Sequence, residues 1–157
     1  MKLELTLKTY VKLKDDLDTI PHNFKQEQKM PKINKYVDID TVEREAKKDL
    51  IDRHSPFITV QGDAKVGEML AVNVKMGQEY THPDDFDHFI ESITLFNGET
   101  KLAAAEFVPG TLGNEKSHAE VTFNIRPMGK KLNLVAHGYC TKHGIWESTP
   151  VEVEVAQ

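Results

Sequence analysis

From residue 57 onward, apolar and polar residues alternate in short runs, a pattern typical of strands with one buried face. The alternation is clearest at Leu70, Val72 and Val74, which stand two positions apart. The same spacing recurs in three further runs, at 121–125, 132–134 and 151–155. Because successive side chains of a strand point to opposite faces, each run can bury one face in a core. The sequence therefore predicts a series of short strands.

Turn residues separate these runs. Pairs containing glycine or proline lie between them, at 62–63, 76–77, 97–98, 109–110 and 128–129. Asn97-Gly98 is the strongest hairpin signal, because both residues tolerate the positive φ angles of a tight hairpin turn. About seven short strands at this spacing indicate an all-β fold, an immunoglobulin-like antiparallel β-sandwich. We assign this domain to residues 51–157.

Residues 1–50 have a different pattern, with many lysines and acids, two prolines and little alternation. We interpret them as an irregular amino-terminal extension. Its last part predicts a short helix over about residues 41–52, with Asp40 as N-cap and Glu43 completing a capping box. Such a helix would lead the chain directly to His54.

Composition excludes several classes of protein. The 157 residues are 39% hydrophobic and 29% charged, close to the globular average. The formal net charge of −5 favours no nucleic-acid partner. No run approaches the roughly 18 apolar residues of a membrane span, and charges interrupt the first thirty positions, so we expect a cytoplasmic protein without a membrane partner. The single cysteine, Cys140, excludes an intramolecular disulfide.

Five residues are candidates for metal binding, and they stand in three motifs: H-x-P, H-P-x4-H and C-x2-H-G-x-W. The residues are His54, His82, His88, Cys140 and His143. A C-x2-H turn brings a thiolate and an imidazole to the same side. Imidazoles with a thiolate suit iron, copper or zinc, whereas magnesium and calcium prefer oxygen. A structural zinc site has four ligands, but five donors on a six-coordinate metal leave one position open for a small molecule.

The remaining histidines and the single tryptophan lack a partner pattern. We therefore expect structural or solvent-facing roles for His22, His118 and His137. Trp146 is expected to pack in the core and, if it lies beside a metal, to help exclude water from it.

The three motifs resemble those of the superoxide reductase family, also called neelaredoxin or, with an added rubredoxin-like domain, desulfoferrodoxin. The family motifs are E-K-H-x-P, H-P-x4-H and C-N-x-H-G-x-W on an immunoglobulin-like sandwich, and the match extends from about Asp52 to Val155. The resemblance implies one iron ion, Fe(II) or Fe(III), with four equatorial histidine nitrogens and the sulfur of Cys140 as axial ligand. An open sixth position would accept superoxide for one-electron reduction to hydrogen peroxide.

The resemblance also implies partners. An electron donor such as a rubredoxin-like protein must restore Fe(II), and the homo-oligomers found in the family suggest self-association here. The extension lacks the four cysteines of the rubredoxin-like domain, so the chain fits the single-iron class.

Two catalytic positions of the family are altered in this chain. The glutamate that ligates ferric iron and the lysine that attracts superoxide correspond to Asp52 and Arg53. Aspartate is one methylene shorter, so we expect water or hydroxide at the ferric sixth position. Arg53 keeps the attracting charge, but its pKa is too high for proton donation, which leaves that role to water. Acids at 84, 85 and 87 add local negative charge that opposes superoxide approach.

Other functions remain open. A non-catalytic iron protein of the same family, serving as a redox or nitric oxide sensor, would keep the ligands and lose efficient turnover. An electron carrier resembling cupredoxins is disfavoured, because no methionine follows His143 and the H-P-x4-H pair has no place in that site. A structural interaction module would not bind metal, and a Cys-His hydrolase would need a nucleophile elbow that the sequence lacks.

Overall fold

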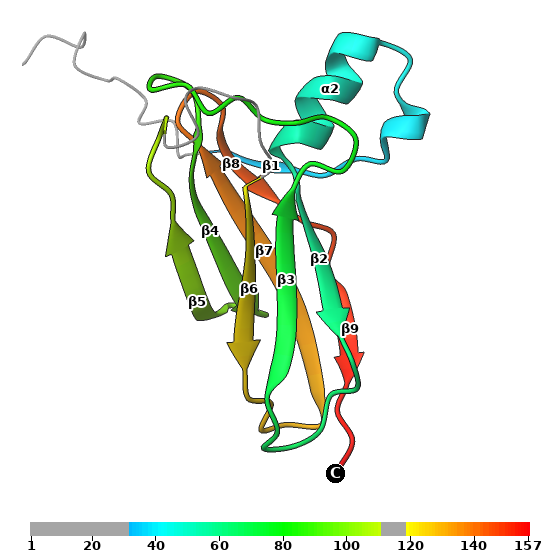
Figure 1. Ribbon diagram of the computed structural model, residues 1–157. Helices are drawn as coiled ribbons and strands as arrows, with labels where there is room; N and C mark the ends of the chain where they lie inside the picture. The colour runs from blue at the N-terminus through cyan, green and yellow to red at the C-terminus, as the bar shows by residue number, and fades with distance from the viewer. Residues whose placement is uncertain (1–31, 111–118) are drawn as a thin grey trace, which may run out of the picture. The chain divides into compact units, whose positions relative to one another are not determined.

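Nine strands and one α-helix make up the described part of the chain, residues 32–110 and 119–157, in a computed structural model (Figure 1). In chain order the elements are β1 (Ile33–Lys35), the 3-10 helix η2 (Ile39–Thr41), α2 (Glu45–His54), β2 (Pro56–Gln61), β3 (Leu70–Met76), β4 (Ile90–Asn97), β5 (Thr100–Glu106), β6 (Glu120–Ile125), β7 (Lys131–Cys140), β8 (Gly144–Glu147) and β9 (Val151–Glu154). Within these described ranges, no helix is long and apolar enough to cross a membrane.

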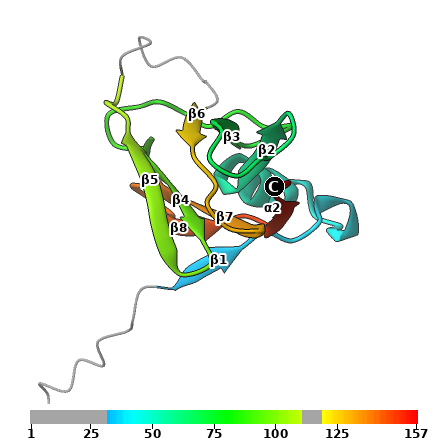
Figure 2. The same cartoon turned by 90° about the horizontal axis from the view of Figure 1, so that it is seen from below.

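The strands form two sheets that pack face to face (Figure 2). One sheet has the order β1-β8-β7-β4-β5, with β9 also paired to β7, and the other has the order β2-β3-β6. The predicted all-β sandwich is therefore confirmed. Two details differ from the prediction: the described residues contain nine strands instead of about seven, and β1 pairs with β8 in parallel whereas the other pairs are antiparallel.

The core lies between the sheets and follows the predicted alternation. On β3 every second residue is buried, from Leu70 to Met76. On β7 the same alternation buries Leu132, Leu134 and Ala136 and ends at Cys140. The sandwich core therefore extends to the thiol, because Cys140 is the last inward-facing position of its strand.

The hairpin predicted at Asn97-Gly98 is present. It joins β4 to β5, with Asn97 and Thr100 as the last register pair. The side-chain oxygen of Asn97 also accepts a hydrogen bond of 2.8 Å from the backbone N–H of Asn133 on β7. The turn is thus tied to both neighbours of β4 in the sheet.

The predicted helix exists, but its predicted start and cap are wrong. Helix α2 begins at Glu45 instead of 41, and its N-cap, Arg44, makes no side-chain capping bond. Asp38, two positions before the predicted cap, instead caps the 3-10 helix η2. Its carboxylate accepts a hydrogen bond of 3.0 Å from the backbone N–H of Asp40. The chain is then extended at Val42, which is buried, so Asp40 and Glu43 do not form the expected capping box.

Residues 31–157 form one compact unit, so this unit begins earlier than the predicted domain boundary at residue 51. Part of the predicted extension packs in a second small core, where Ile39 and Val42 meet Ile51 and Trp146. Strand β1 also comes from this segment. The rest of the extension, residues 1–31, lies outside the described residues.

Candidate metal centre

Three segments bring the candidate ligands to one end of the sandwich (Figure 1). His54 is the last residue of α2, and His82 and His88 lie in the connection between β3 and β4. Cys140 ends β7 and His143 precedes β8, so both belong to one hairpin. In that hairpin Cys140 is paired with Gly144, whose φ of 75° suits a short turn closed by glycine.

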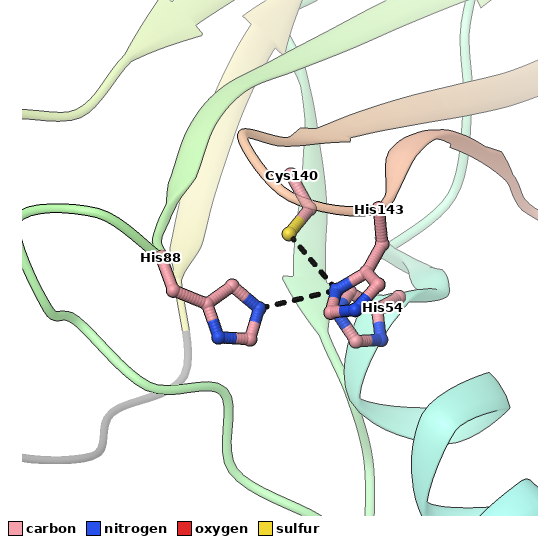
Figure 3. A group of neighbouring side chains, drawn as sticks. All are labelled: His54, His88, Cys140 and His143. Atoms are coloured by element: carbon pink, nitrogen blue, oxygen red, sulfur yellow. Dashed lines mark hydrogen bonds between the residues drawn. The ribbon is translucent and has the colours of Figure 1, made fainter.

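Four of the five predicted ligands have donor atoms within 4.8 Å of one another: His54, His88, Cys140 and His143 (Figure 3). The closest pair joins Nε2 of His88 to Nδ1 of His143, at 3.2 Å. The Sγ atom of Cys140 lies 3.6 Å from the same Nδ1 atom. Donor atoms from separate segments thus converge on one small volume, as binding of a shared ion requires.

His82 joins this cluster through its ring, although it is not one of the four. Its ring centroid lies 4.7 Å from that of His54 and 4.7 Å from that of His88. The side chain is 1% exposed. The structure therefore brings all five predicted side chains together, with His82 on the buried side of the group.

The hydrogen bonding of the buried ring nitrogens of His54 and His82 shows whether these residues fit a metal. Each Nδ1 atom lies 2.6 Å from a carbonyl oxygen, that of Leu50 for His54 and that of Pro83 for His82. A carbonyl oxygen only accepts, so each Nδ1 carries the proton and each Nε2 presents a lone pair. Both Nε2 atoms are buried without a hydrogen-bond partner. Because an unpartnered buried polar atom is costly, these lone pairs fit ligation of a cation.

Burial also sets the protonation of the donors. It lowers the pKa of His54 to about 3 and that of His82 to about 4, from an ordinary value of 6.5. Burial likewise lowers the pKa of His88 and of His143, so all four rings are neutral near pH 7. The cluster therefore offers imidazoles in the form that binds metals.

The thiol of Cys140 has the opposite tendency. Burial raises its pKa, while backbone N–H groups of Lys142 and His143, which hydrogen-bond to the sulfur, lower it in part. A metal ion would displace the thiol proton, and the two N–H groups would then stabilise the bound thiolate.

Trp146 contacts the cluster directly as well as the small core. Its ring stacks on that of His54, with centroids 5.3 Å apart and an interplanar angle of 25°. Its Nε1–H donates to the carbonyl oxygen of His143 at 3.3 Å. His137 instead pairs with Glu147, Nε2 to Oε2 at 3.0 Å, in the sheet. The other two histidines, His22 and His118, lie outside the described residues.

Arg53, one residue before the first ligand, is paired within α2. Its guanidinium forms an ion pair with Asp49, one turn earlier, and its side chain is 20% exposed. Its positive charge is among the causes that lower the pKa of His82, His88 and His143. The cation therefore lies within electrostatic reach of the cluster.

Asp52 occupies a different position from the one the resemblance implied. Its carboxylate is 1% exposed and accepts hydrogen bonds from the backbone N–H groups of Gln78, Glu79 and Tyr80. The side chain is thus engaged by the chain itself, and the expectation that water or hydroxide takes the ferric sixth position stays a prediction. Sequence analysis missed this role, because the partners stand 26 to 28 positions further on.

The acidic segment between His82 and His88 is partly neutralised. The carboxylate of Asp87 accepts from Nζ of Lys142 at 3.0 Å, and this hydrogen bond lowers the pKa of Asp87. The backbone groups of Asp85 and His88 bond to each other in both directions, at 3.2 and 3.0 Å. Asp85 therefore helps to position a ligand, and Lys142, which the sequence did not single out, supplies a compensating charge.

The fold and this cluster together define a class of protein. It is a β-sandwich protein whose histidines and single thiol lie together at one end of the sandwich, where they could hold an iron ion. The model of the desulfoferrodoxin family matches residues 41–149, more than half of the chain. The chain belongs to this family, as the motifs predicted.

Individual relatives and solved structures point to the same family. The superoxide reductase of Pyrococcus furiosus is 28% identical over 109 residues, covering 62% of this chain and 86% of the relative. The superoxide reductase of Thermococcus kodakarensis is 31% identical over 103 residues, covering 62% and 84%. The structure of the superoxide reductase (neelaredoxin) from Ignicoccus hospitalis superposes with a TM-score of 0.59 at 26% identity, covering 78% of this chain and 94% of that one.

Proposed function

We propose that the chain is a superoxide reductase: it holds one iron ion between His54, His82, His88, His143 and Cys140 and reduces superoxide to hydrogen peroxide. The observation that carries the proposal is the pair of buried, unpartnered Nε2 atoms of His54 and His82 beside the other three donors. Five nitrogen and sulfur donors suit iron and leave a six-coordinate ion one position for substrate.

Bound Fe(II) would supply the single electron that superoxide needs, and two protons complete hydrogen peroxide. The protein's part is to hold the donors ready. The carbonyl oxygens of Leu50 and Pro83 keep both Nε2 lone pairs available, and Trp146 covers one face of the His54 ring. The Cys140 thiolate would donate electron density to a bound metal, and the N–H groups of Lys142 and His143 would moderate that donation.

Arg53 has the role of attracting the substrate. Superoxide is an anion, and a fixed positive charge beside a partly buried site raises its local concentration. An arginine side chain attracts an anion through its fixed charge and is not a proton donor. The protons therefore come from water, and a separate donor, such as a rubredoxin-like protein, returns the electron to iron.

The first test is the reaction itself. The protein is loaded with Fe(II) without oxygen, its iron content is measured, and its oxidation by pulsed superoxide is followed with a count of peroxide formed. We expect one iron per chain, near diffusion-limited oxidation and one peroxide per superoxide consumed.

Variants at Cys140 and His137 sharpen this test. Cys140→Ser should abolish the reaction and the thiolate-to-iron absorption, while His137→Gln, outside the cluster, should change neither. A chain that binds no iron under these conditions would refute the proposal.

The alternative is a non-catalytic iron protein of the same family, a redox or nitric oxide sensor or an electron carrier. The acidic segment favours it, because Asp84 and Asp85 add negative charge to the loop in which Lys142 offsets the charge of Asp87. Stable iron binding with slow oxidation by superoxide would support this alternative.

A further inference from the structure

A short turn after β3, residues 77–80, is attached to helix α2 at three points. The backbone N–H of Gly77 donates to the carbonyl oxygen of Ser55 at 2.9 Å, just past the end of the helix. The hydroxyl of Tyr80 donates to the carboxylate of Glu45 at the start of the helix. Between these two points lies the carboxylate of Asp52.

Of the three attachments, the one at Asp52 has the most hydrogen bonds. Its Oδ2 atom accepts from three consecutive backbone N–H groups, those of Gln78, Glu79 and Tyr80, at 3.0, 2.9 and 2.8 Å. Successive N–H groups that converge on one anion form a nest, and charge-assisted bonds of this kind are about twice as strong as neutral ones. A carboxylate that is 1% exposed needs such partners.

The start of the turn leaves no room for a side chain. Gly77 has a φ of 72°, and a Cβ atom placed on it would lie 2.5 Å from the carbonyl oxygen of Tyr80 and 3.2 Å from the Cα atom of Arg53. The backbone of the turn therefore packs directly on the helix end. The neighbouring cation, Arg53, pairs with Asp49, and the hydrogen bonds to Asp52 come from backbone N–H groups of the turn.

The two joined segments are the ones that carry the buried ligands. His54 follows Asp52 by two positions, and His82 follows Tyr80 by two positions. Their rings lie edge to face, 4.7 Å apart. We propose that Asp52 is a positioning residue: it fastens the 77–80 turn to α2 and so sets where His82 stands relative to His54 in the metal site.

This inference rests on the proposed metal site but assigns a role that the ligand set alone does not require. In this chain the acid two positions before the first ligand acts on the metal only through His82. Loss of a group that orients a ligand typically weakens metal binding 10- to 100-fold. The effect of removing Asp52 should therefore depend on the presence of His82.

A double-mutant cycle on Fe(II) affinity, measured anaerobically by competition with a chelator, tests this dependence. Asp52→Asn should weaken binding 10- to 100-fold in the wild-type background, and by less than about threefold when His82 is already alanine. In a His143→Ala background, Asp52→Asn should again weaken Fe(II) binding 10- to 100-fold. Asp40→Asn, an exposed acid outside the turn, is the matched control and should have no effect.

Hydrogen exchange of the metal-free chain provides a measurement that needs neither iron nor activity. The amides of residues 78–80 should be protected in the wild type and exchange much faster in Asp52→Asn, with β7 amides unchanged. Unprotected amides in the wild type, or an equal loss of affinity in the His82→Ala and His143→Ala backgrounds, would overturn the inference. Absence of Fe(II) binding by the wild type would instead refute the proposed function, while the exchange result would still decide whether Asp52 anchors the turn.

Discussion

At the scale of single residues, backbone groups decide how the donors of the cluster face one another. The carbonyl oxygens of Leu50 and Pro83 hold the protons of His54 and His82 on Nδ1, and two N–H groups hydrogen-bond to the sulfur of Cys140. A side-chain partner could rotate away, whereas these groups belong to a helix and to tight loops. The donor set is thus preorganised before any metal arrives.

Arg53 gives a prediction at this scale. Arg53→Met removes the cation beside the cluster and should lower the second-order rate constant with superoxide about tenfold at low salt. The rate constant should also lose most of its dependence on ionic strength. Arg53→Lys keeps the charge and is the matched control. Pulsed-superoxide kinetics at two salt concentrations measure both effects, and an unchanged rate in Arg53→Met would show that this charge does not attract the substrate.

At the scale of elements, two of the five candidate ligands stand at the end of a regular element, and the other three lie in the connections that follow. His54 closes a helix, Cys140 closes β7, and the turn 77–80 leads from β3 toward His82. The conformations at these ends are demanding, as the positive φ of Gly77 and Gly144 shows. Rigid elements therefore place the donors, and short turns adjust the final orientation.

The turn after β3 gives a prediction at this scale. Gly77→Ala adds a Cβ atom 2.5 Å from a backbone oxygen at a positive φ, so both crowding and backbone strain oppose it. We expect a loss of roughly 3 kcal/mol in the free energy of unfolding. Gly62→Ala has a similar φ of 82° but no neighbour within 4 Å, and should lose about 1 kcal/mol. Urea unfolding of both variants makes the comparison, and equal losses would contradict the crowding argument.

At the scale of the whole molecule, folding buries ionisable rings that the unfolded chain leaves in water. His54 and His82 are each 1% exposed, and their rings lie among those of His88 and His143. Burial favours their neutral form, so folding is coupled to pH through these two residues. This coupling belongs to the metal-free chain.

The stability of the metal-free chain should therefore decrease in acid. The folded pKa values of about 3 for His54 and about 4 for His82 lie below the ordinary 6.5 of an unfolded chain, so the unfolded state binds more protons below that value. Stability is thus complete above about pH 6.5 and is lost as the pH falls toward the folded values. Between pH 7 and 5 we expect a loss of roughly 2 kcal/mol per histidine.

Urea unfolding at several pH values measures this dependence. A His54→Gln/His82→Gln variant should lose most of the slope, because glutamine does not titrate. A wild-type stability that stays level between pH 7 and 5 would contradict the coupling.

The sequence by itself determined the features that depend on local patterns. Alternation along β3 and β7 predicted the strands and the sandwich, because one-sided burial imposes a two-residue period. Asn97-Gly98 predicted its hairpin, since a two-residue turn needs residues that accept positive φ. The three motifs identified the five candidate ligands and the family, because the spacing within each motif reflects a local loop.

Only the tertiary structure decided the features that depend on segments distant in the sequence. The start of α2 differs from the prediction because Asp38 caps a separate turn before it and Val42 is buried in a core with Trp146. Asp52 corresponds to a catalytic position of the family, but its carboxylate accepts from three N–H groups in a turn that folding brings beside the helix. No local pattern predicts such partners, because hydrogen bonds and burial between separate segments are set only when the two sheets and the helix pack together.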